Sequence, residues 1–305
     1  MAGTDKRGSD GFPKKGRIIK AISGFYYVYT EDELLRQCRA RGLFKLKGLS
    51  LLVGDYVTYS PVGEREGVIE EVAKRSSVLV RPPVANVDQV LLVFSVQEPA
   101  VTLFQLDKMA AMVERQGLSL ALVFTKTDLP GAQASLADLM RVYEPLYPMF
   151  ATSVKTGAGL DGLVAYMAQK TTALAGLSGV GKSSLLGHLV PDATVVTGEV
   201  SKRSQRGRHT TRHVELFFGC GGMIVDTPGF SQYSFADAEP EDAQAWFREL
   251  AVYAADCEFR GCLHESEQGC AVRAARAAGS LAQSRYANYL QLLAEIKQLK
   301  AKRYT

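Results

Sequence analysis

Residues 176–183 read GLSGVGKS, which fits the G-x-x-x-x-G-K-[ST] pattern of a phosphate-binding loop. A strand-like TTAL precedes the loop and an apolar helix follows it, so the backbone N–H groups at the start of that helix would converge on phosphate oxygens. Lys182 would neutralise the β- and γ-phosphates, and Ser183 would offer its hydroxyl to Mg²⁺. We expect phosphate contacts from the whole loop, namely Gly176, Ser178, Gly179, Val180, Gly181, Lys182, Ser183 and Ser184.

A second element with Mg²⁺ chemistry is the segment MIVDTPG at residues 223–229. Its buried-strand run ends in an acid and then a Pro-Gly turn. Asp226 would hold the metal through water, and the Gly229 N–H would face the γ-phosphate. Both this segment and the phosphate loop follow predicted strands, and open α/β sheets bind ligands at the carboxyl ends of their strands.

The segment TKTD at residues 125–128 predicts which base is bound. The carboxylate of Asp128 can accept from the N1–H and the 2-amino group of guanine, and adenine has neither donor. Lys126 would lie along the base and the phosphate loop. Thr125 stands where the common N-K-x-D pattern has Asn, so a hydroxyl replaces an amide near N7 of the base.

A loop for the O6 atom of guanine is predicted at TSVKTG, where backbone N–H groups of Ser153, Val154 and Lys155 would face the base. Both base-reading segments precede the phosphate loop, which reverses the common order. Circular permutation explains this order, because domain termini lie at the surface and often close together. The Asp226 segment then ends the nucleotide domain. A nucleotide-dependent change there could move the part of the chain that follows it as a rigid body.

Near the C-terminus the pattern C-x₄-C-x-H-x₅-C comprises Cys257, Cys262, His264 and Cys270. Three thiolates and one imidazole close a tetrahedral Zn²⁺ site and leave no position open for water, which predicts a structural ion. A redox cluster is the alternative. The ion would stabilise a short loop that has no core of its own. We expect Cys38 and Cys220 to be small buried residues.

The pattern of apolar residues predicts three modules that position these groups. Residues 16–75 carry short strands separated by turns, typical of a small β-barrel. From residue 90 onward strands alternate with helices, near 103–116 and 134–143, which indicates a mostly parallel sheet covered on both faces. After residue 229 the chain is helical at 239–250 and again at 282–304.

Composition limits the function classes. Apolar residues make up 47% and charged residues 22% of the 305, as in soluble globular proteins, and no apolar run approaches the length of a membrane span. The first residues have no apolar h-region, so we expect a disordered tail and no signal peptide. Five cysteines without an export signal favour a reducing compartment. A formal charge of +4 is too small to establish a nucleic-acid partner.

The segments GLSGVGKSS, RGRHTTRHVEL, DTPGF and TKTD, with the cysteine–histidine cluster, are similar to the RsgA (YjeQ) family of circularly permuted, ribosome small-subunit-dependent GTPases. The resemblance covers about 15–305. It implies an OB-fold at 15–80 after a tail at 1–14, a permuted α/β P-loop GTPase domain at 81–231, and a helical zinc-binding module at 232–305. It further implies a cytoplasmic monomer that uses GTP, Mg²⁺ and Zn²⁺ and binds the 30S subunit and its 16S rRNA in late maturation.

The most basic stretch is 201–214, which contains no acid. Either Thr210 or Thr211 would supply a hydroxyl to Mg²⁺. The stretch is either a solvated loop or a switch that contacts rRNA phosphates and orders with GTP. Four cations at the end of the last helix either contact RNA or offset the helix dipole, namely Lys297, Lys300, Lys302 and Arg303.

Position 230, where many GTPases have a glutamine that orients the attacking water, holds Phe230. An apolar ring cannot hydrogen-bond water, so we expect slow turnover by the protein alone. The family resemblance implies that His209 orients the water once the switch closes. Phe230 also supports an alternative, an RNA-binding regulator in which GTP is only a conformational ligand. A small-molecule kinase is a third hypothesis, against which Asp128 and the second Mg²⁺ element count.

Overall fold

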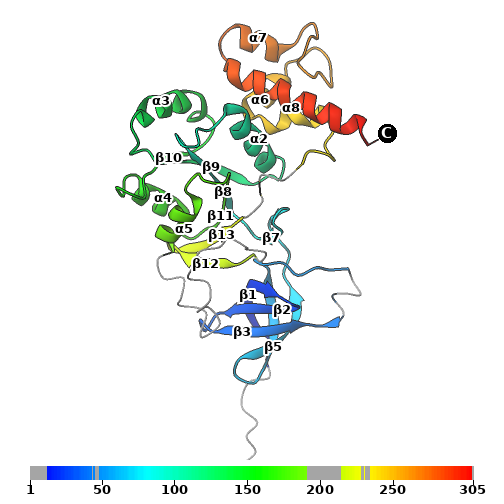
Figure 1. Ribbon diagram of the computed structural model, residues 1–305. Coiled ribbons are helices and arrows are strands. Elements are labelled where there is room, and N and C mark those ends of the chain that lie inside the picture. The colour runs from blue at the N-terminus through cyan, green and yellow to red at the C-terminus, as the bar shows by residue number, and fades with distance from the viewer. Residues whose placement is uncertain are drawn as a thin grey trace, which may run out of the picture.

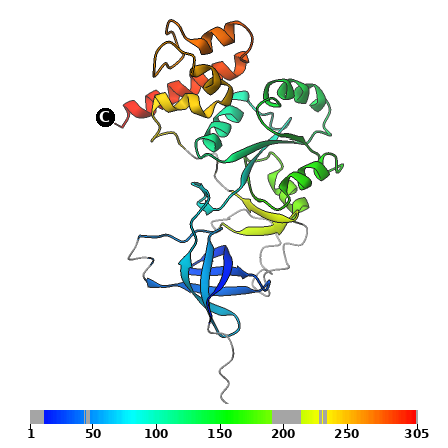
Figure 2. The ribbon, with the colours of Figure 1, turned by 180° about the vertical axis from the view of Figure 1, so that it is seen from behind.

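The computed structural model describes residues 12–42, 44, 48–190, 214–227, 230 and 234–303. Three parts follow one another along the molecule in chain order, a barrel, a sheet with helices, and a helical C-terminal module (Figures 1 and 2). His209, Thr210, Thr211 and Gly229 lie outside the described residues, as do residues 1–11. In the part of the chain that is described, no helix has the length and apolar character that a membrane crossing requires.

The N-terminal part is a closed five-stranded barrel, which confirms the predicted barrel. Its strands pair in the order β1-β2-β3-β5-β4, with β3 and β5 parallel and the other pairs antiparallel. Residues on alternating positions fill the interior, among them Ile18, Val28 and Ile69. The strand bounds are β1 Lys14–Ile22, β2 Phe25–Thr30, β3 Leu35–Ala40, β4 Tyr56–Val62 and β5 Glu66–Val72.

The central part is a six-stranded sheet in the order β10-β9-β8-β11-β13-β12. The first five strands are parallel and β12 is antiparallel to β13. A short ribbon of β6 Val78–Leu79 and β7 Val84–Ala85 connects the barrel to this sheet. The bounds are β8 Gln89–Ser95, β9 Ser119–Thr125, β10 Met149–Ala151, β11 Thr171–Gly176, β12 Leu216–Gly219 and β13 Gly222–Asp226.

Helices cover both faces of this sheet, as the alternation of strands and helices predicts. In β8 every residue is buried, and Leu92 and Phe94 pack in the core that contains α2 (Leu103–Glu114) and α3 (Ala132–Tyr143). Leu91 and Val93 face the opposite core, built on α4 (Leu160–Met167) and α5 (Lys182–Leu189). The strict alternation along β8 therefore places the four helices in two layers.

The C-terminal module consists of η2 (Pro240–Trp246), α6 (Arg248–Ala254), α7 (Ala271–Ala277) and α8 (Gln283–Ala301). Its contact with the sheet domain is centred on Arg285 of α8, which pairs with Asp107 of α2 at 2.6 Å and with Glu249 of α6 at 2.5 Å. Asn288 also donates to Asp107, at 2.6 Å. The module is thus fixed to α2, a contact that the sequence did not predict.

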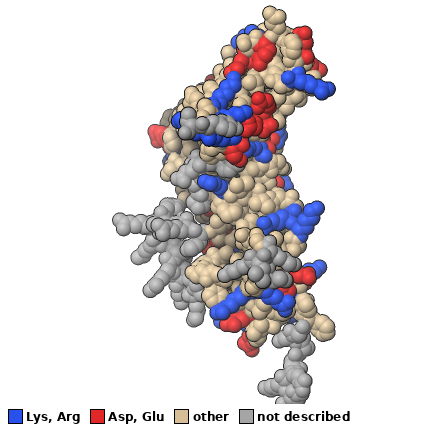
Figure 3. All heavy atoms as spheres, turned by 90° about the vertical axis from the view of Figure 1, so that its right-hand side faces the viewer, with Lys and Arg blue, Asp and Glu red and all other residues tan. Residues whose placement is uncertain are grey.

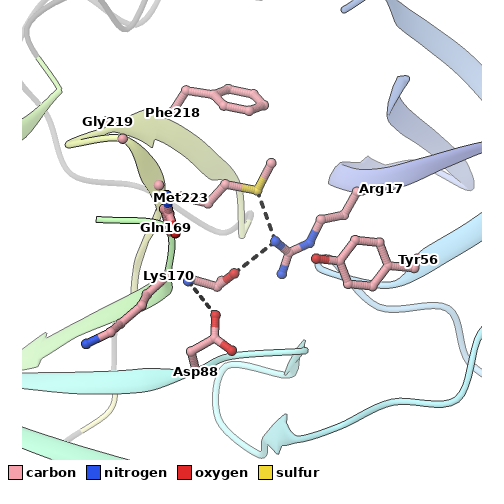
Figure 4. A pocket seen from close by; sticks show the side chains of 11 residues that line it. Arg17, Tyr56, Asp88, Gln169, Lys170, Phe218, Gly219 and Met223 are labelled. Carbon is pink, nitrogen blue, oxygen red and sulfur yellow. Dashed lines mark hydrogen bonds between the residues drawn. The ribbon is translucent and has the colours of Figure 1, made fainter. Parts of the chain in front are cut away.

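The barrel meets the sheet through Arg17 of β1 (Figure 4). Its guanidinium donates to Thr171 Oγ1 of β11 at 2.8 Å and to the Asn86 carbonyl at 3.0 Å, and it contacts Met223 Sδ of β13 at 3.1 Å. Arg17, Thr171 and Met223 also line a pocket of about 420 Å³ between the two parts. Barrel and sheet therefore meet beside the amino ends of β11 and β13.

Candidate functional site

Four predicted segments meet at one edge of the sheet. Because β9, β10, β11 and β13 run parallel, their carboxyl ends lie together. These ends carry Thr125, the loop at 152–157, Gly176 and Asp226, respectively. The base-reading and phosphate-binding segments are therefore neighbours in space although their order along the chain is reversed.

The phosphate loop needs its glycines for two different reasons. A Cβ atom on Gly176 would lie 2.3 Å from the Val93 carbonyl oxygen, so no side chain fits there. Gly179 and Gly181 have φ angles of 82° and 90°, in the left-handed region that favours glycine. Helix α5 begins directly after Gly181, and the Lys182 ammonium donates to the Gly176 carbonyl at 3.0 Å. The lysine thus lies across the mouth of an anion-binding loop.

The predicted guanine reader, Asp128, is held by the predicted O6 loop. Ser153 Oγ donates to Asp128 Oδ1 at 2.6 Å and accepts from the Thr156 N–H at 3.2 Å. The Lys155 ammonium lies 4.0 Å from Asp128 Oδ2. The hydrogen bond from Ser153 lowers the pKa of the Asp128 carboxyl, which keeps it ionised and able to accept from two base donors.

Lys126 spans two loops at this edge. Its ammonium donates to the Gly179 carbonyl at 3.1 Å and also to the Glu98 carbonyl. Glu98 belongs to the loop after β8, which the sequence analysis did not include in the site. The signal was available, since the strand at 90–96 was predicted and its carboxyl end must lie at the same edge as the others.

The residues predicted to hold Mg²⁺ fit that ion. Asp226 Oδ1 is buried and has no hydrogen-bond partner among the described residues, which leaves a carboxylate oxygen for a metal or its water ligand. Ser183 lies in the first turn of α5, next to Lys182. Thr227 fixes the end of β13, since its hydroxyl donates to the Leu174 carbonyl of β11 at 2.7 Å. Carboxylate and hydroxyl oxygens are ligands that Mg²⁺ prefers.

Phe230 is fully buried in the core that contains α2. Its ring therefore contributes packing at this position. This placement agrees with the expectation that another residue must orient the attacking water.

The four predicted zinc ligands come together. Their ligand atoms all lie within 4.8 Å of one another, with His264 Nδ1 3.6 Å from Cys257 Sγ and 3.4 Å from Cys270 Sγ. His264 Nε2 lies 2.8 Å from the Gln244 side-chain oxygen, which requires the proton on Nε2 and leaves Nδ1 for a metal. Burial raises the pKa of Cys262 to about 12, so a cation is needed to keep a thiolate there.

Helix α8 hydrogen-bonds to the backbone of the loop that carries the four predicted zinc ligands, residues 257–270, here called the metal loop. The Tyr286 hydroxyl donates to the His264 carbonyl at 2.6 Å, and the Tyr289 hydroxyl donates to the Leu263 carbonyl at 3.0 Å. Of the two other cysteines, Cys38 is buried in the barrel as expected, whereas Cys220 is half-buried in the turn between β12 and β13.

Two acids pair with three of the cations predicted at the end of α8. Lys297 pairs with Glu265 at 2.6 Å, Arg303 pairs with Glu239 at 3.1 Å, and Lys300 also pairs with Glu239. Figure 3 looks onto this side of the molecule, where acidic and basic side chains intermingle over the upper part. The ion pairs make this end of α8 a mixed surface.

Together the strand order, the phosphate loop and the predicted guanine-reading aspartate indicate a circularly permuted P-loop GTPase with an N-terminal barrel and a C-terminal Cys₃His module. A family model described as RsgA GTPase matches residues 72–236, and one described as RsgA N-terminal domain matches residues 15–69. The chain belongs to the RsgA GTPase family.

Relatives and solved structures agree over nearly the whole chain. The small ribosomal subunit biogenesis GTPase RsgA of Geobacillus thermodenitrificans is 45% identical over 289 residues, which span 94% of this chain and 98% of that protein. Its counterpart in Bacillus subtilis is 41% identical over 293 residues, with the same coverage.

The crystal structure of YloQ, described as a circularly permuted GTPase, superimposes on this chain with a TM-score of 0.82 at 37% identity. The match covers 97% of this chain and 99% of that chain. YjeQ from Thermotoga maritima gives 0.82 at 36% identity, covering 93% and 99%.

Proposed function

We propose that this chain hydrolyses GTP to GDP and phosphate on the small (30S) ribosomal subunit, acts in the late maturation of that subunit, and leaves it after hydrolysis. The observation that carries the proposal is the convergence of Asp128, the phosphate loop and Asp226 at one sheet edge. The names of relatives that are 41–45% identical, each a small ribosomal subunit biogenesis GTPase, support the choice of partner.

In the proposed reaction water attacks the γ-phosphorus, the bond to the β–γ bridging oxygen breaks, and GDP leaves. Lys182 and the backbone N–H groups of the phosphate loop stabilise the negative charge on the phosphate oxygens. Ser183 and Asp226 would hold Mg²⁺, with Thr210 or Thr211 as a further ligand, and the ion would stabilise charge on the phosphate oxygens. The Gly229 N–H would face the γ-phosphate, and His209 would orient the water.

The remaining assignments are part of the same proposal. The chain acts as a cytoplasmic monomer that contacts 16S rRNA, with the basic residues of 201–214 facing the RNA phosphates. Cys257, Cys262, His264 and Cys270 hold one structural Zn²⁺.

The test is steady-state GTP hydrolysis by the purified protein, alone and with isolated 30S or 50S subunits. We expect stimulation by 30S subunits and not by 50S subunits, and loss of turnover in Lys182→Ala. Lys170→Ala is the matched control, because Lys170 precedes the opposite end of the same strand, β11. Tight GTP binding without stimulation by either subunit would contradict the proposal and favour the non-enzymatic regulator.

A further inference from the structure

Thr125 is buried where the predicted base-reading segment meets the phosphate loop. Its side chain ends β9 and is only 3% exposed. The hydroxyl oxygen lies 3.1 Å from the Phe94 carbonyl oxygen of β8 and closer still to the Val180 carbonyl oxygen of the phosphate loop. Gly181 packs against it, because a Cβ atom built there would lie 3.5 Å from Thr125 Oγ1.

The number of donors decides what this hydroxyl can do. A threonine hydroxyl has one proton, whereas the amide of an asparagine has two. An asparagine at this position can therefore donate to the phosphate loop and to N7 of guanine together. Thr125 can donate to one acceptor, and both acceptors within reach are backbone carbonyls. Turning the proton to N7 would give up the buried hydrogen bond from Thr125 to the phosphate loop, which is costly.

We propose that Thr125 is a positioning residue for the phosphate loop and that this site reads guanine without a hydrogen bond to N7. This inference rests on the proposed function as a GTPase. Base identity then depends on Asp128, which faces N1 and the 2-amino group, and on the O6 loop. The Lys126 ammonium donates to the carbonyls of Gly179 and Glu98, and in this proposal it does not bond N7.

The consequence is a defined substrate tolerance. Guanine nucleotides with carbon in place of nitrogen at position 7 keep every donor and acceptor that the site uses. They bind and turn over like GTP, whereas adenine nucleotides do not. Loss of the Thr125 hydroxyl weakens the binding of all guanine nucleotides to the same extent, because the group that it affects is the phosphate loop.

The experiment compares equilibrium binding of GDP, 7-deaza-GDP and ADP to the full chain and to Thr125→Val and Thr125→Ser. For the wild type we expect dissociation constants for GDP and 7-deaza-GDP within about twofold of each other, and no binding of ADP. Thr125→Val should weaken both guanine nucleotides about fivefold with their ratio unchanged, the size expected for one hydrogen bond. Thr125→Ser keeps a hydroxyl and should restore the affinity, which separates this role from general loss of structure.

A tenfold or greater preference of the wild type for GDP over 7-deaza-GDP, abolished in Thr125→Val, would overturn the inference while leaving the GTPase proposal intact. Equal affinity for ADP, or no binding of either guanine nucleotide, would overturn the proposed function and the inference with it. Thermal unfolding of each variant confirms that the compared proteins are folded.

Discussion

Ser153 donates one hydrogen bond to Asp128, the carboxylate that is proposed to read the base. Because that bond lowers the pKa of Asp128, removing it raises the pKa toward its ordinary value. Asp128 must be ionised to accept from guanine, so affinity is present above its pKa and is lost as the pH falls through it. In Ser153→Ala we expect GDP to bind about fivefold more weakly at neutral pH. We also expect the loss of GDP affinity on acidification to begin at a higher pH than in the wild type.

The measurement for this variant is the dissociation constant of GDP between pH 4 and pH 8. Titration of the nucleotide itself cancels when the variant is compared with the wild type. Thr156→Ala is the matched control, since its hydroxyl accepts from the Ala158 N–H and does not contact Asp128. Loss of GDP affinity at the same pH in all three proteins would contradict the role of Ser153.

A second residue-scale prediction concerns the attacking water. Since Phe230 is buried in the core, we expect His209→Ala to lower stimulated turnover by about 10²–10⁴-fold with GTP affinity unchanged. His188→Ala, on the exposed side of α5, should change neither quantity. Single-turnover hydrolysis and equilibrium binding check the two halves of the prediction, and unchanged turnover in His209→Ala would exclude this role.

Clusters of residues within one short motif could be predicted from the sequence. The four residues predicted to bind zinc do come together, because their spacing fits one short loop. The roles of Lys182 and Asp128 stay predictions. The Glu98 carbonyl and the Gln244 side chain contribute through contacts between distant segments. No local pattern encodes the Gln244 contact, whereas the Glu98 loop could have been included because it follows the predicted strand at 90–96, whose carboxyl end lies at the edge of the site.

At the scale of elements, one buried ion pair network joins α8 to α2. Arg285 and Asp107 are each 1% exposed, and removing one partner leaves a charge buried without compensation. We expect Arg285→Met to lower the free energy of unfolding by about 3–5 kcal/mol. Urea unfolding measures this value, and limited proteolysis should show early cleavage within 234–303.

The matched control for this pair lies at the same interface. Asp237 pairs with Arg115 of the segment after α2 but is 73% exposed, so Asp237→Ala should cost less than about 1 kcal/mol. Equal effects of the two variants would show that the buried network does not hold the module. The helical spacing at 282–304 predicted α8, yet it could not reveal that Arg285 faces inward, because a charged residue on an amphipathic helix normally lies outside.

The metal loop is a second element-scale case. Gln244 of η2 fixes the ring of His264, and such outer contacts change metal affinity by about 10–100-fold. We therefore expect Gln244→Ala to bind Zn²⁺ more weakly in competition with a chelator while still purifying with one ion. Cys257→Ser should lose the ion, and Cys220→Ser, outside the cluster, should keep it with unchanged affinity. Equal zinc affinity in Gln244→Ala and the wild type would exclude this role of Gln244.

At the scale of the whole molecule, the sequence indicated three modules but not how they pack. The permuted order suggested that a nucleotide-dependent change at the end of β13 could move the C-terminal module, which stays a prediction; the structure adds that this module is bonded to α2. The barrel, in turn, contacts β11 and β13, the two strands that end in Gly176 and Asp226. Contacts of this kind depend on complementary surfaces of separate modules, which apolar periodicity does not specify.

Arg17 is the residue that tests whether the barrel acts on the nucleotide site through these strands. It is 7% exposed, and its hydrogen bonds to Thr171 and the Asn86 carbonyl hold the barrel beside β11. Arg17→Met keeps the stem of the side chain and removes these bonds, so a barrel bound to the small subunit would no longer orient the sheet. We expect basal GTP turnover within about twofold of the wild type and stimulated turnover reduced about tenfold, the equivalent of about 1.4 kcal/mol.

The control is Lys20→Met, which removes only the partly exposed pair with Glu215 and should have a smaller effect. Parallel loss of basal and stimulated turnover in Arg17→Met would instead mean that Arg17 supports the sheet itself, and the barrel would then be a docking domain without influence on hydrolysis.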